Sequence, residues 1–244
     1  MLQFDNQRKI YHSTILDNPH IISGFGTKKS GDGMDEKSLL HFFSSHSISY
    51  DHLMIPKQTH STNVRIQLSS PAEHIAYVPN TDGLITKLPR HLLIVETADC
   101  VPIIFHDTKN NIAGISHQGW RGTLECMQTR MVEGLTGIGS DINSVHVAIG
   151  PSIGACCYNI THERYMQFQE KFPQYTEEIF EHKDNEIYLN LIKLNYLLLR
   201  DKGIQEKHID YFPFCTKCNA DMFYSYRREK QKGKGEMFNY VMIK

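Results

Sequence analysis

Three side chains that lie far apart in the sequence have the types that bind transition metals. His60 follows one apolar segment, Cys100 follows another, and His117 ends a third. Imidazole nitrogen and thiolate sulfur are common zinc ligands, and three of them leave the fourth tetrahedral position open, as in catalytic sites. Copper accepts the same ligands, so ligand type does not choose between the metals. The residue types therefore suggest a catalytic metal site.

The same residues allow a second chemistry. A cysteine attacks as a nucleophile when its thiol pKa is lowered and a base lies nearby. Cys100 has two candidate bases, His117 and His60. A metal ion would occupy the thiolate and prevent nucleophilic attack, so the two interpretations compete, and sequence spacing leaves both open.

Two further motifs contain cysteines that could bind a metal or form a redox pair. The Cys215-Thr216-Lys217-Cys218 segment is half of a zinc ribbon or a redox pair. Cys156 and Cys157 are adjacent and do not form a second pair with suitable spacing. We therefore interpret these cysteines as buried thiols, with a structural zinc site as the alternative.

Arginine and aromatic residues predict an anion and heterocycle site. Trp120-Arg121 follows His117 directly, and Arg227 lies in an aromatic cluster. An arginine guanidinium binds phosphate through two hydrogen bonds, and tryptophan or tyrosine stacks on flat rings. The Gly-rich loop that begins at Lys28 offers a further anion site, with an ordinary surface turn as the alternative.

The elements that position these residues follow from short apolar runs. Runs over 92–95, 101–105 and 112–116 predict buried strands, and the polar segment 107–111 predicts a hairpin turn. That hairpin would bring Cys100 and His117 together. Further strands are expected over 21–27, 53–56, 64–68, 82–86, 145–149, 208–214 and 237–243, and helices over 35–47, 123–135, 163–172 and 189–202. The mixed-sign segment 227–236 predicts a solvated hairpin turn.

Composition bounds the class of protein. The 244 residues carry a net charge of 26 − 27 = −1, and we find no repeat or linker, so we expect one domain over residues 1–244. This charge gives no argument for nucleic acid, and no apolar stretch approaches the roughly 18 residues of a membrane span. The start of the chain lacks the apolar region of a signal peptide, and the six cysteines are unevenly spread. We therefore expect a reduced, cytoplasmic protein.

Five motifs occur in a specific order along the chain: Gln58-Thr59-His60, Thr97–Pro102, His117–Thr123, Ile149–Tyr158, and Cys215-Thr216 followed by Phe223–Arg228. The ordered set resembles the YfiH-like family, also called the polyphenol oxidase or laccase domain. Members of this family are identified as purine nucleoside phosphorylases with adenosine deaminase activity. The resemblance implies an α+β fold with mixed β-sheets packed between helical layers, an α/β/β/α arrangement.

The resemblance also implies roles for individual residues. His60, Cys100 and His117 would bind zinc, with copper as the alternative, and the substrates would be a purine nucleoside and phosphate. Gln58 and Arg121, with Lys28 or Arg227, would bind substrate, because phosphorolysis needs an anion clamp. Asp99 would move protons beside the metal or orient a ligand histidine.

Two departures from the family pattern bear on phosphate binding. Lys28 follows Thr27 where the family has arginine, and Glu236 stands where an arginine is usual, so its charge would repel phosphate. Copper-dependent phenol oxidation and a thiol hydrolase using Cys100 remain as alternatives. A four-copper laccase is disfavoured because no two histidines are separated by a single residue.

Overall fold

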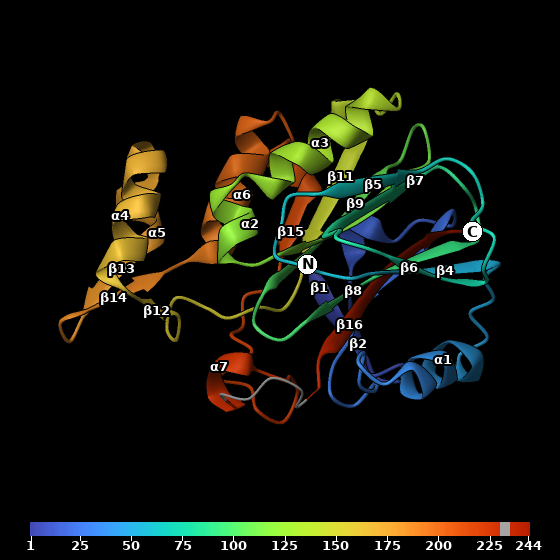
Figure 1. The fold of residues 1–244 in the computed structure, drawn as a ribbon, viewed down its shortest axis with the longest axis horizontal. Helices are drawn as coiled ribbons and strands as arrows, with labels where there is room; N and C mark the ends of the chain where they lie inside the picture. Colours follow the sequence, from blue (N-terminus) through green and yellow to red (C-terminus); the bar gives the residue numbers. More distant parts are fainter. Residues whose placement is uncertain (230–234) are drawn as a thin grey trace.

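Two β-sheets pack face to face at the centre of the molecule (Figure 1). The computed structural model describes residues 1–229 and 235–244. The larger sheet has seven strands in the order β1 (Leu2–Asp5), β2 (Ile10–Ser13), β3 (Ile21–Phe25), β16 (Met237–Ile243), β8 (His91–Thr97), β4 (His52–Pro56) and β6 (Ile75–Val78). The second has six, in the order β15 (Ile209–Tyr211), β11 (Val145–Ile149), β9 (Val101–Asp107), β10 (Ile112–Gln118), β7 (Gly83–Thr86) and β5 (Val64–Gln67).

Both sheets mix parallel and antiparallel pairs. In the six-stranded sheet β9, β10 and β7 form an antiparallel array, whereas β11 pairs with β15 and β5 with β7 in parallel. The predicted hairpin between β9 and β10 is confirmed, with Asp107 opposite Ile112 and Pro102 opposite His117. Inward-facing apolar side chains of both sheets, including Val95, Ile104 and Ile115, fill the space between the sheets.

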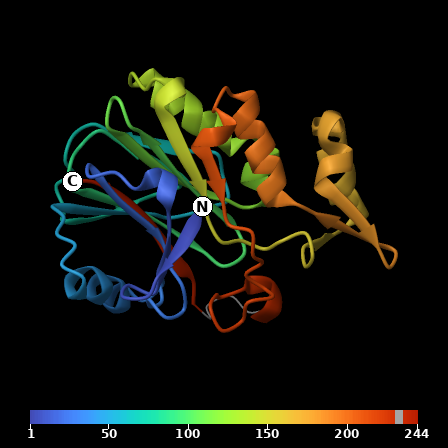
Figure 2. The same ribbon diagram turned by 180° about the vertical axis from the view of Figure 1, so that it is seen from behind.

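Helices cover the outer faces of both sheets. On the seven-stranded sheet, α1 (Glu36–Ser45) packs Phe42 and Phe43 against Phe238 and Tyr240. On the six-stranded sheet lie α3 (Met127–Gly137) and α6 (Leu191–Asp201) (Figure 2). The layers run α/β/β/α, which confirms the expected fold class.

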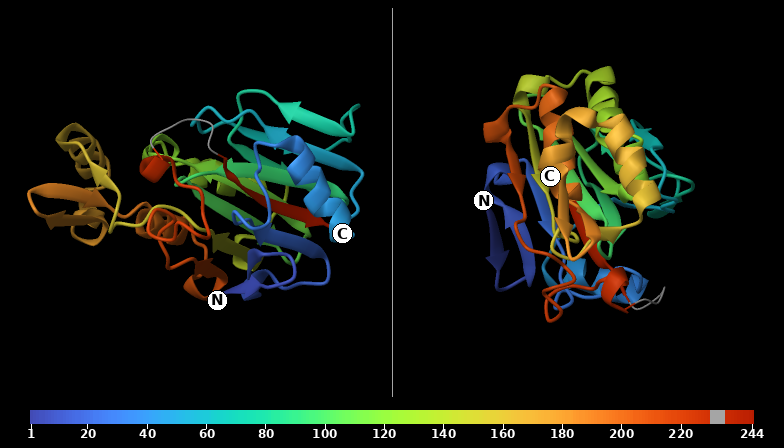
Figure 3. Two further views of the ribbon diagram at one scale, coloured as in Figure 1. Left: turned by 90° about the horizontal axis from the view of Figure 1, so that it is seen from below. Right: turned by 90° about the vertical axis from the view of Figure 1, so that its left-hand side faces the viewer.

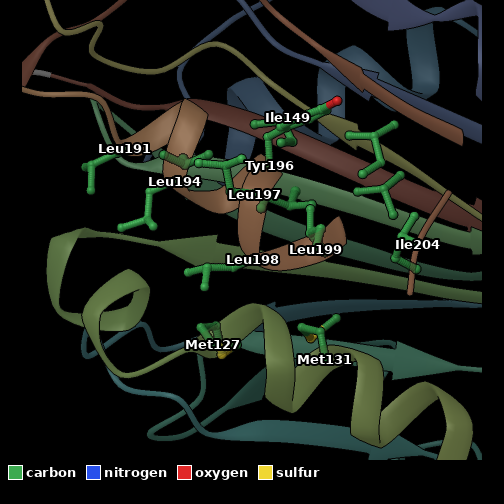
Figure 4. Close-up of a cluster of buried hydrophobic side chains, with 14 of the residues drawn as sticks. Met127, Met131, Ile149, Leu191, Leu194, Tyr196, Leu197, Leu198, Leu199 and Ile204 are labelled. Atoms are coloured by element: carbon green, nitrogen blue, oxygen red, sulfur yellow. The ribbon is translucent and has the colours of Figure 1, made fainter. Parts of the chain in front are cut away.

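Helix α6 illustrates how sequence pattern produces this packing. Asn190 caps its first turn by accepting a hydrogen bond from the Lys193 N–H, and Gly203 follows its end with a left-handed backbone (φ +92°). Leu194 and Leu198 recur at a four-residue step and lie in the same apolar cluster as Met127 and Met131 of α3 (Figure 4).

The sequence predicted one helix over 123–135, and this prediction is wrong in its continuity. The chain forms α2 (Trp120–Leu124), then breaks at Cys126, whose left-handed backbone (φ 59°) cannot continue a right-handed helix, and resumes as α3. The other three predicted helices are confirmed within a few residues at their ends: α1, α4 (His162–Lys171) and α6.

A third sheet, not predicted, forms a lobe beside the main body (Figure 3). It contains β12 (Asn159–Ile160), β14 (Glu186–Leu189) and β13 (Phe180–Lys183), covered by α4 and α5 (Thr176–Ile179). Single 3-10 turns occur at η1 (Thr14–Leu16), η2 (Ile142–Ser144), η3 (Pro173–Tyr175) and η4 (Glu206–His208).

Of the predicted hairpin turn over 227–236, the first residues instead belong to a short helix, α7 (Tyr226–Glu229), and 230–234 lie outside the described residues. Within the described ranges, no helix is both long and apolar enough to cross a membrane.

Candidate metal centre and active-site cavity

The ends of two adjacent strands and one loop bring the candidate ligands together. Cys100 directly precedes β9, and His117 lies near the end of β10, opposite Pro102. His60 arrives from the other sheet, on the loop that connects β4 to β5. The ligand atoms of these three residues all lie within 4.8 Å of one another, with His60 Nε2 3.9 Å from Cys100 Sγ.

A carboxylate that the sequence analysis did not identify organises these ligands. Asp82 directly precedes β7 and lies beside His117, because Gly83 pairs with Ser116. Its fully buried carboxylate accepts a hydrogen bond from His117 Nδ1 (2.8 Å), and its backbone carbonyl accepts the His117 N–H (2.8 Å). The same carboxylate accepts the backbone N–H groups of His60 (3.0 Å) and Ser61 (2.8 Å). One side chain thus holds two of the three ligands.

The Asp82 contact determines which nitrogen of His117 can bind a metal. Because Nδ1 donates to the carboxylate, Nε2 is left as the ligand atom. Burial alone would raise the pKa of Asp82, but hydrogen bonds from His117 and Ser61 hold that pKa well below its usual range. The carboxylate is therefore ionised and fixes the histidine tautomer.

Charge couples Cys100 to His117. Burial alone would raise the pKa of the Cys100 thiol, but the His117 charge and hydrogen bonds from both histidines lower it below its usual value. Burial alone would lower the pKa of His117, but the Cys100 thiolate and Asp82 raise it instead. Without a metal the pair thus favours thiolate and imidazolium, and a metal ion would displace the His117 proton. Two nitrogens and one thiolate at these separations fit a tetrahedral ion with one open position.

Close packing around the ligands requires a glycine at position 119. A Cβ atom added there would lie 2.8 Å from His60 Cδ2 and 3.2 Å from Cys100 Sγ. Gly119 has an extended backbone (φ −71°), so the requirement is for space rather than for an unusual conformation.

The candidate ligands open into a cavity of about 1160 Å³. Four of the residues predicted to act on substrate line it: Gln58, Asp99, Arg121 and Arg227. Lys28 is not among the lining residues. Its ammonium donates to the Ala220 carbonyl (3.0 Å) and pairs with Glu229 (3.4 Å).

Two of the lining residues use their polar atoms to hold the backbone. The Gln58 amide donates to the Glu96 carbonyl and accepts the Glu96 N–H, both at 2.8 Å. The Asp99 carboxylate accepts hydrogen bonds from the hydroxyls of Thr216 (2.6 Å) and Ser225 (2.9 Å) and from the Arg227 N–H (2.7 Å). Asp99 therefore anchors the C-terminal segment to the start of β9, and Asp82 rather than Asp99 orients the ligand histidine.

One wall of the cavity carries three guanidinium groups that lie on aromatic rings. Arg121 and Arg164 lie over the Trp120 ring, 4.4 and 3.9 Å from its centroid, and Arg227 lies 4.9 Å from the centroid of Tyr158. Sequence analysis missed Arg164 because it lies on α4 of the lobe, in a helix without a recognisable motif. This wall favours an anion.

Acidic groups also line the cavity. Burial, with the charges of Glu236 and Asp32, raises the pKa of Glu96 to about 7. Glu96 and Glu236 are both lining residues. A carboxyl group with this pKa exchanges protons near neutral pH, which suits general acid–base catalysis.

Comparison with known proteins identifies the class. The model of the family described as multi-copper polyphenol oxidoreductase laccase matches residues 36–244, and the chain belongs to that family. The resemblance to YfiH-like proteins is thereby confirmed.

The names of individual relatives state more specific activities than the family description does. The chain is 27% identical to the purine nucleoside phosphorylase YlmD of Bacillus subtilis, over 95% of this chain and 91% of that protein. It is 29% identical to the adenosine deaminase RL5 of an unidentified prokaryote, over 74% and 71% of the two chains. The crystal structure of the Bacillus licheniformis hypothetical protein YfiH superposes with a TM-score of 0.80 at 27% identity, covering 94% of this chain and 98% of that one.

The space requirement at Gly119 generates a prediction. Gly119→Ala should weaken the binding of an added metal ion at these three ligands about tenfold or more while the protein still folds, because the added methyl displaces His60 and Cys100. Equilibrium titration in zinc buffers measures this effect. Gly137→Ala is the matched control, since an added Cβ there meets no atom within 4 Å. Equal affinities in the two variants would contradict the packing argument.

The raised pKa of Glu96 generates a second prediction. Because the pKa of Glu96 is higher in the folded protein than in the unfolded chain, ionised Glu96 destabilises the folded state. This destabilisation is absent below about pH 4.5 and complete above about pH 7. Glu96→Gln should therefore raise the free energy of unfolding at pH 8 by about 1–3 kcal/mol, and much less at pH 5. Urea denaturation at both pH values measures this. The exposed Glu133→Gln is the control, and an equal effect at both pH values would contradict the assignment.

Proposed function

We propose that the protein is a metal-dependent purine nucleoside phosphorylase that also deaminates adenosine. Its substrates would be adenosine, inosine or 5'-methylthioadenosine with phosphate, and its products the base and the corresponding ribose 1-phosphate. The observation that carries the proposal is that one cavity joins the His60, Cys100 and His117 donors to a wall of arginines. The names of the family's relatives support the same reaction classes.

The arginine wall supplies the phosphate site in this proposal. Phosphorolysis breaks the N-glycosidic bond as the ribose gains oxocarbenium character and phosphate attacks the anomeric carbon. Arg121 and Arg227 would bind the phosphate. Arg164 would be the third phosphate-binding residue, in place of Lys28, which the sequence suggested and which does not line the cavity. Stacking on Trp120 and Tyr158 orients the guanidinium groups and so reduces the entropy lost on binding.

Proton transfer to the purine is assigned to Glu96. The departing base needs a proton, and a carboxyl group with a pKa of about 7 is partly protonated at neutral pH. The oxygens of Asp99 already accept three hydrogen bonds, so we assign Asp99 to positioning Arg227. Gln58 would hold the Glu96 backbone, and with it the acid, in place.

The metal site is assigned to deamination. His60, Cys100 and His117 would hold the ion, which we propose to be zinc, with copper as the alternative. When bound, such an ion acts as a Lewis acid that lowers the pKa of water. Asp82 keeps His117 in the tautomer that this ligation requires. We also propose that the chain acts as one catalytic domain in the cytoplasm, where a reduced Cys100 persists.

A second candidate function is a thiol hydrolase. The lowered pKa of Cys100 and its contact with His117 are properties that a nucleophilic cysteine needs. The two functions respond oppositely to chelation. Chelation should abolish adenosine deamination by the metal enzyme, and added zinc should restore it, whereas a thiol hydrolase keeps its activity after chelation and loses it to iodoacetamide.

The proposal predicts the products formed from adenosine. Adenine release should require phosphate, whereas inosine formation should proceed without it, as measured by chromatography across a phosphate titration. Arg164→Ala should raise the KM for phosphate about tenfold or more and change deamination little, because in this proposal the Arg164 guanidinium binds phosphate and not the purine.

Arg130→Ala on the exposed face of α3 is the control for this experiment. If inosine forms but no adenine appears at any phosphate concentration tested, phosphorolysis is rejected. Oxidation of a phenol by the copper-loaded protein, with neither purine product, would favour the oxidase that the family description suggests.

A further inference from the structure

A second cluster of possible metal ligands lies outside the His60, Cys100 and His117 site. Cys156 and Cys157 follow β11, and Cys215 and Cys218 follow β15. The four sulfurs lie within 4.8 Å of one another. The interpretation of these cysteines as buried thiols is confirmed for Cys215 but wrong for Cys156 and Cys218, which are exposed.

Sheet topology explains why sequence spacing was misleading. Strands β11 and β15 are parallel neighbours, with Ile149 opposite Tyr211. The carboxyl ends of parallel neighbours meet at the same end of the sheet, so the loops that follow them lie together. A pair of adjacent cysteines and a C-x-x-C motif, about 60 residues apart, thus form one cluster.

The sulfur separations distinguish metal ligation from disulfide formation. Cys218 Sγ lies 3.4 Å from Cys157 Sγ and 3.7 Å from Cys156 Sγ. A disulfide requires about 2.05 Å. Four thiolates bound tetrahedrally to zinc at about 2.3 Å stand about 3.8 Å apart. The observed separations are therefore close to those of a zinc–tetrathiolate site.

Hydrogen bonds hold both loops in this arrangement. The N–H groups of Cys157 and Tyr158 both donate to the Gly154 carbonyl at 3.0 Å, and the Thr216 N–H donates to the Ser152 carbonyl at 3.0 Å. At Gly154 an added Cβ would lie 3.2 Å from Cys215 Cβ and 3.4 Å from Cys156 Sγ. The close approach of the two loops thus depends on this glycine.

We propose that Cys156, Cys157, Cys215 and Cys218 bind one structural zinc ion. Four protein ligands close the coordination shell, as in structural rather than catalytic sites. The ion would fasten the loop that carries Tyr158 to the loop that carries Thr216. Tyr158 lies beneath Arg227, and Thr216 binds Asp99, so the ion supports one wall of the cavity.

Metal counting tests the proposal. Protein prepared under reducing conditions with zinc should hold two equivalents. His117→Ala should keep the equivalent bound by the four cysteines, and Cys218→Ser should keep only the other. Cys126→Ser is the matched control and should keep both, because Cys126 belongs to neither group.

Cobalt identifies the ligands of the retained ion. In cobalt-loaded His117→Ala the near-ultraviolet thiolate-to-metal absorption should be about four times that of cobalt-loaded Cys218→Ser, since four thiolates replace one. The His117→Ala result stands even if Cys218→Ser fails to fold.

Two outcomes would overturn the proposal. The first is that the wild type binds one zinc equivalent and His117→Ala binds none. Loss of about 2 Da per cysteine pair without bound metal would also overturn it, by showing disulfides instead. Neither outcome bears on the adenosine assay, so the two proposals fail separately.

Discussion

A single buried carboxylate, that of Asp82, positions two of the three ligands of the candidate metal centre. It has no exposed surface, and its oxygens accept hydrogen bonds from the His117 ring, from the Ser61 hydroxyl and from the backbone of the loop that holds His60. Burying a charge without such partners would cost several kcal/mol, so the partners and the charge require one another. The left-handed backbone of His60 (φ 59°) is tolerated because this carboxylate accepts its N–H group.

The remainder of the site is arranged around that interaction by sheet geometry. Adjacent strand ends supply Cys100, His117 and Asp82, and the loop between the two sheets supplies His60. Residues far along the chain then close the cavity. Asp99 binds Thr216, Ser225 and the Arg227 backbone, so the C-terminal segment is tied to the same strand end. The cavity is consequently lined by both cationic and acidic side chains in addition to its donor atoms.

Sequence predicted the parts of the site that local structure determines. The β9–β10 hairpin followed from two apolar runs and a polar turn, and it brings Cys100 to His117 without help from other elements. His60 was identified by residue type, but its position depends on Asp82, which in sequence is only an aspartate before a glycine. Arg164 and the cysteine cluster depend on contacts between distant segments, the lobe in one case and the parallel β11–β15 pair in the other. The break at Cys126 and the short strands of the lobe have no periodic signal, so pattern alone did not predict them. The α/β/β/α layering came from the family resemblance rather than from pattern.

The most direct test of the central claim is the zinc affinity of Asp82→Asn, measured in a Cys218→Ser background so that only the His60, Cys100 and His117 site contributes. The amide loses the charge that holds the His117 tautomer, and we expect affinity to fall about 10- to 100-fold. Asp107→Asn is the comparison, because Asp107 is equally buried and accepts hydrogen bonds from Ser140 and Ser144 at the opposite end of β9. Asp107→Asn should lose stability but keep its zinc affinity. Wild-type affinity in Asp82→Asn, or an equal loss in both variants, would contradict the account.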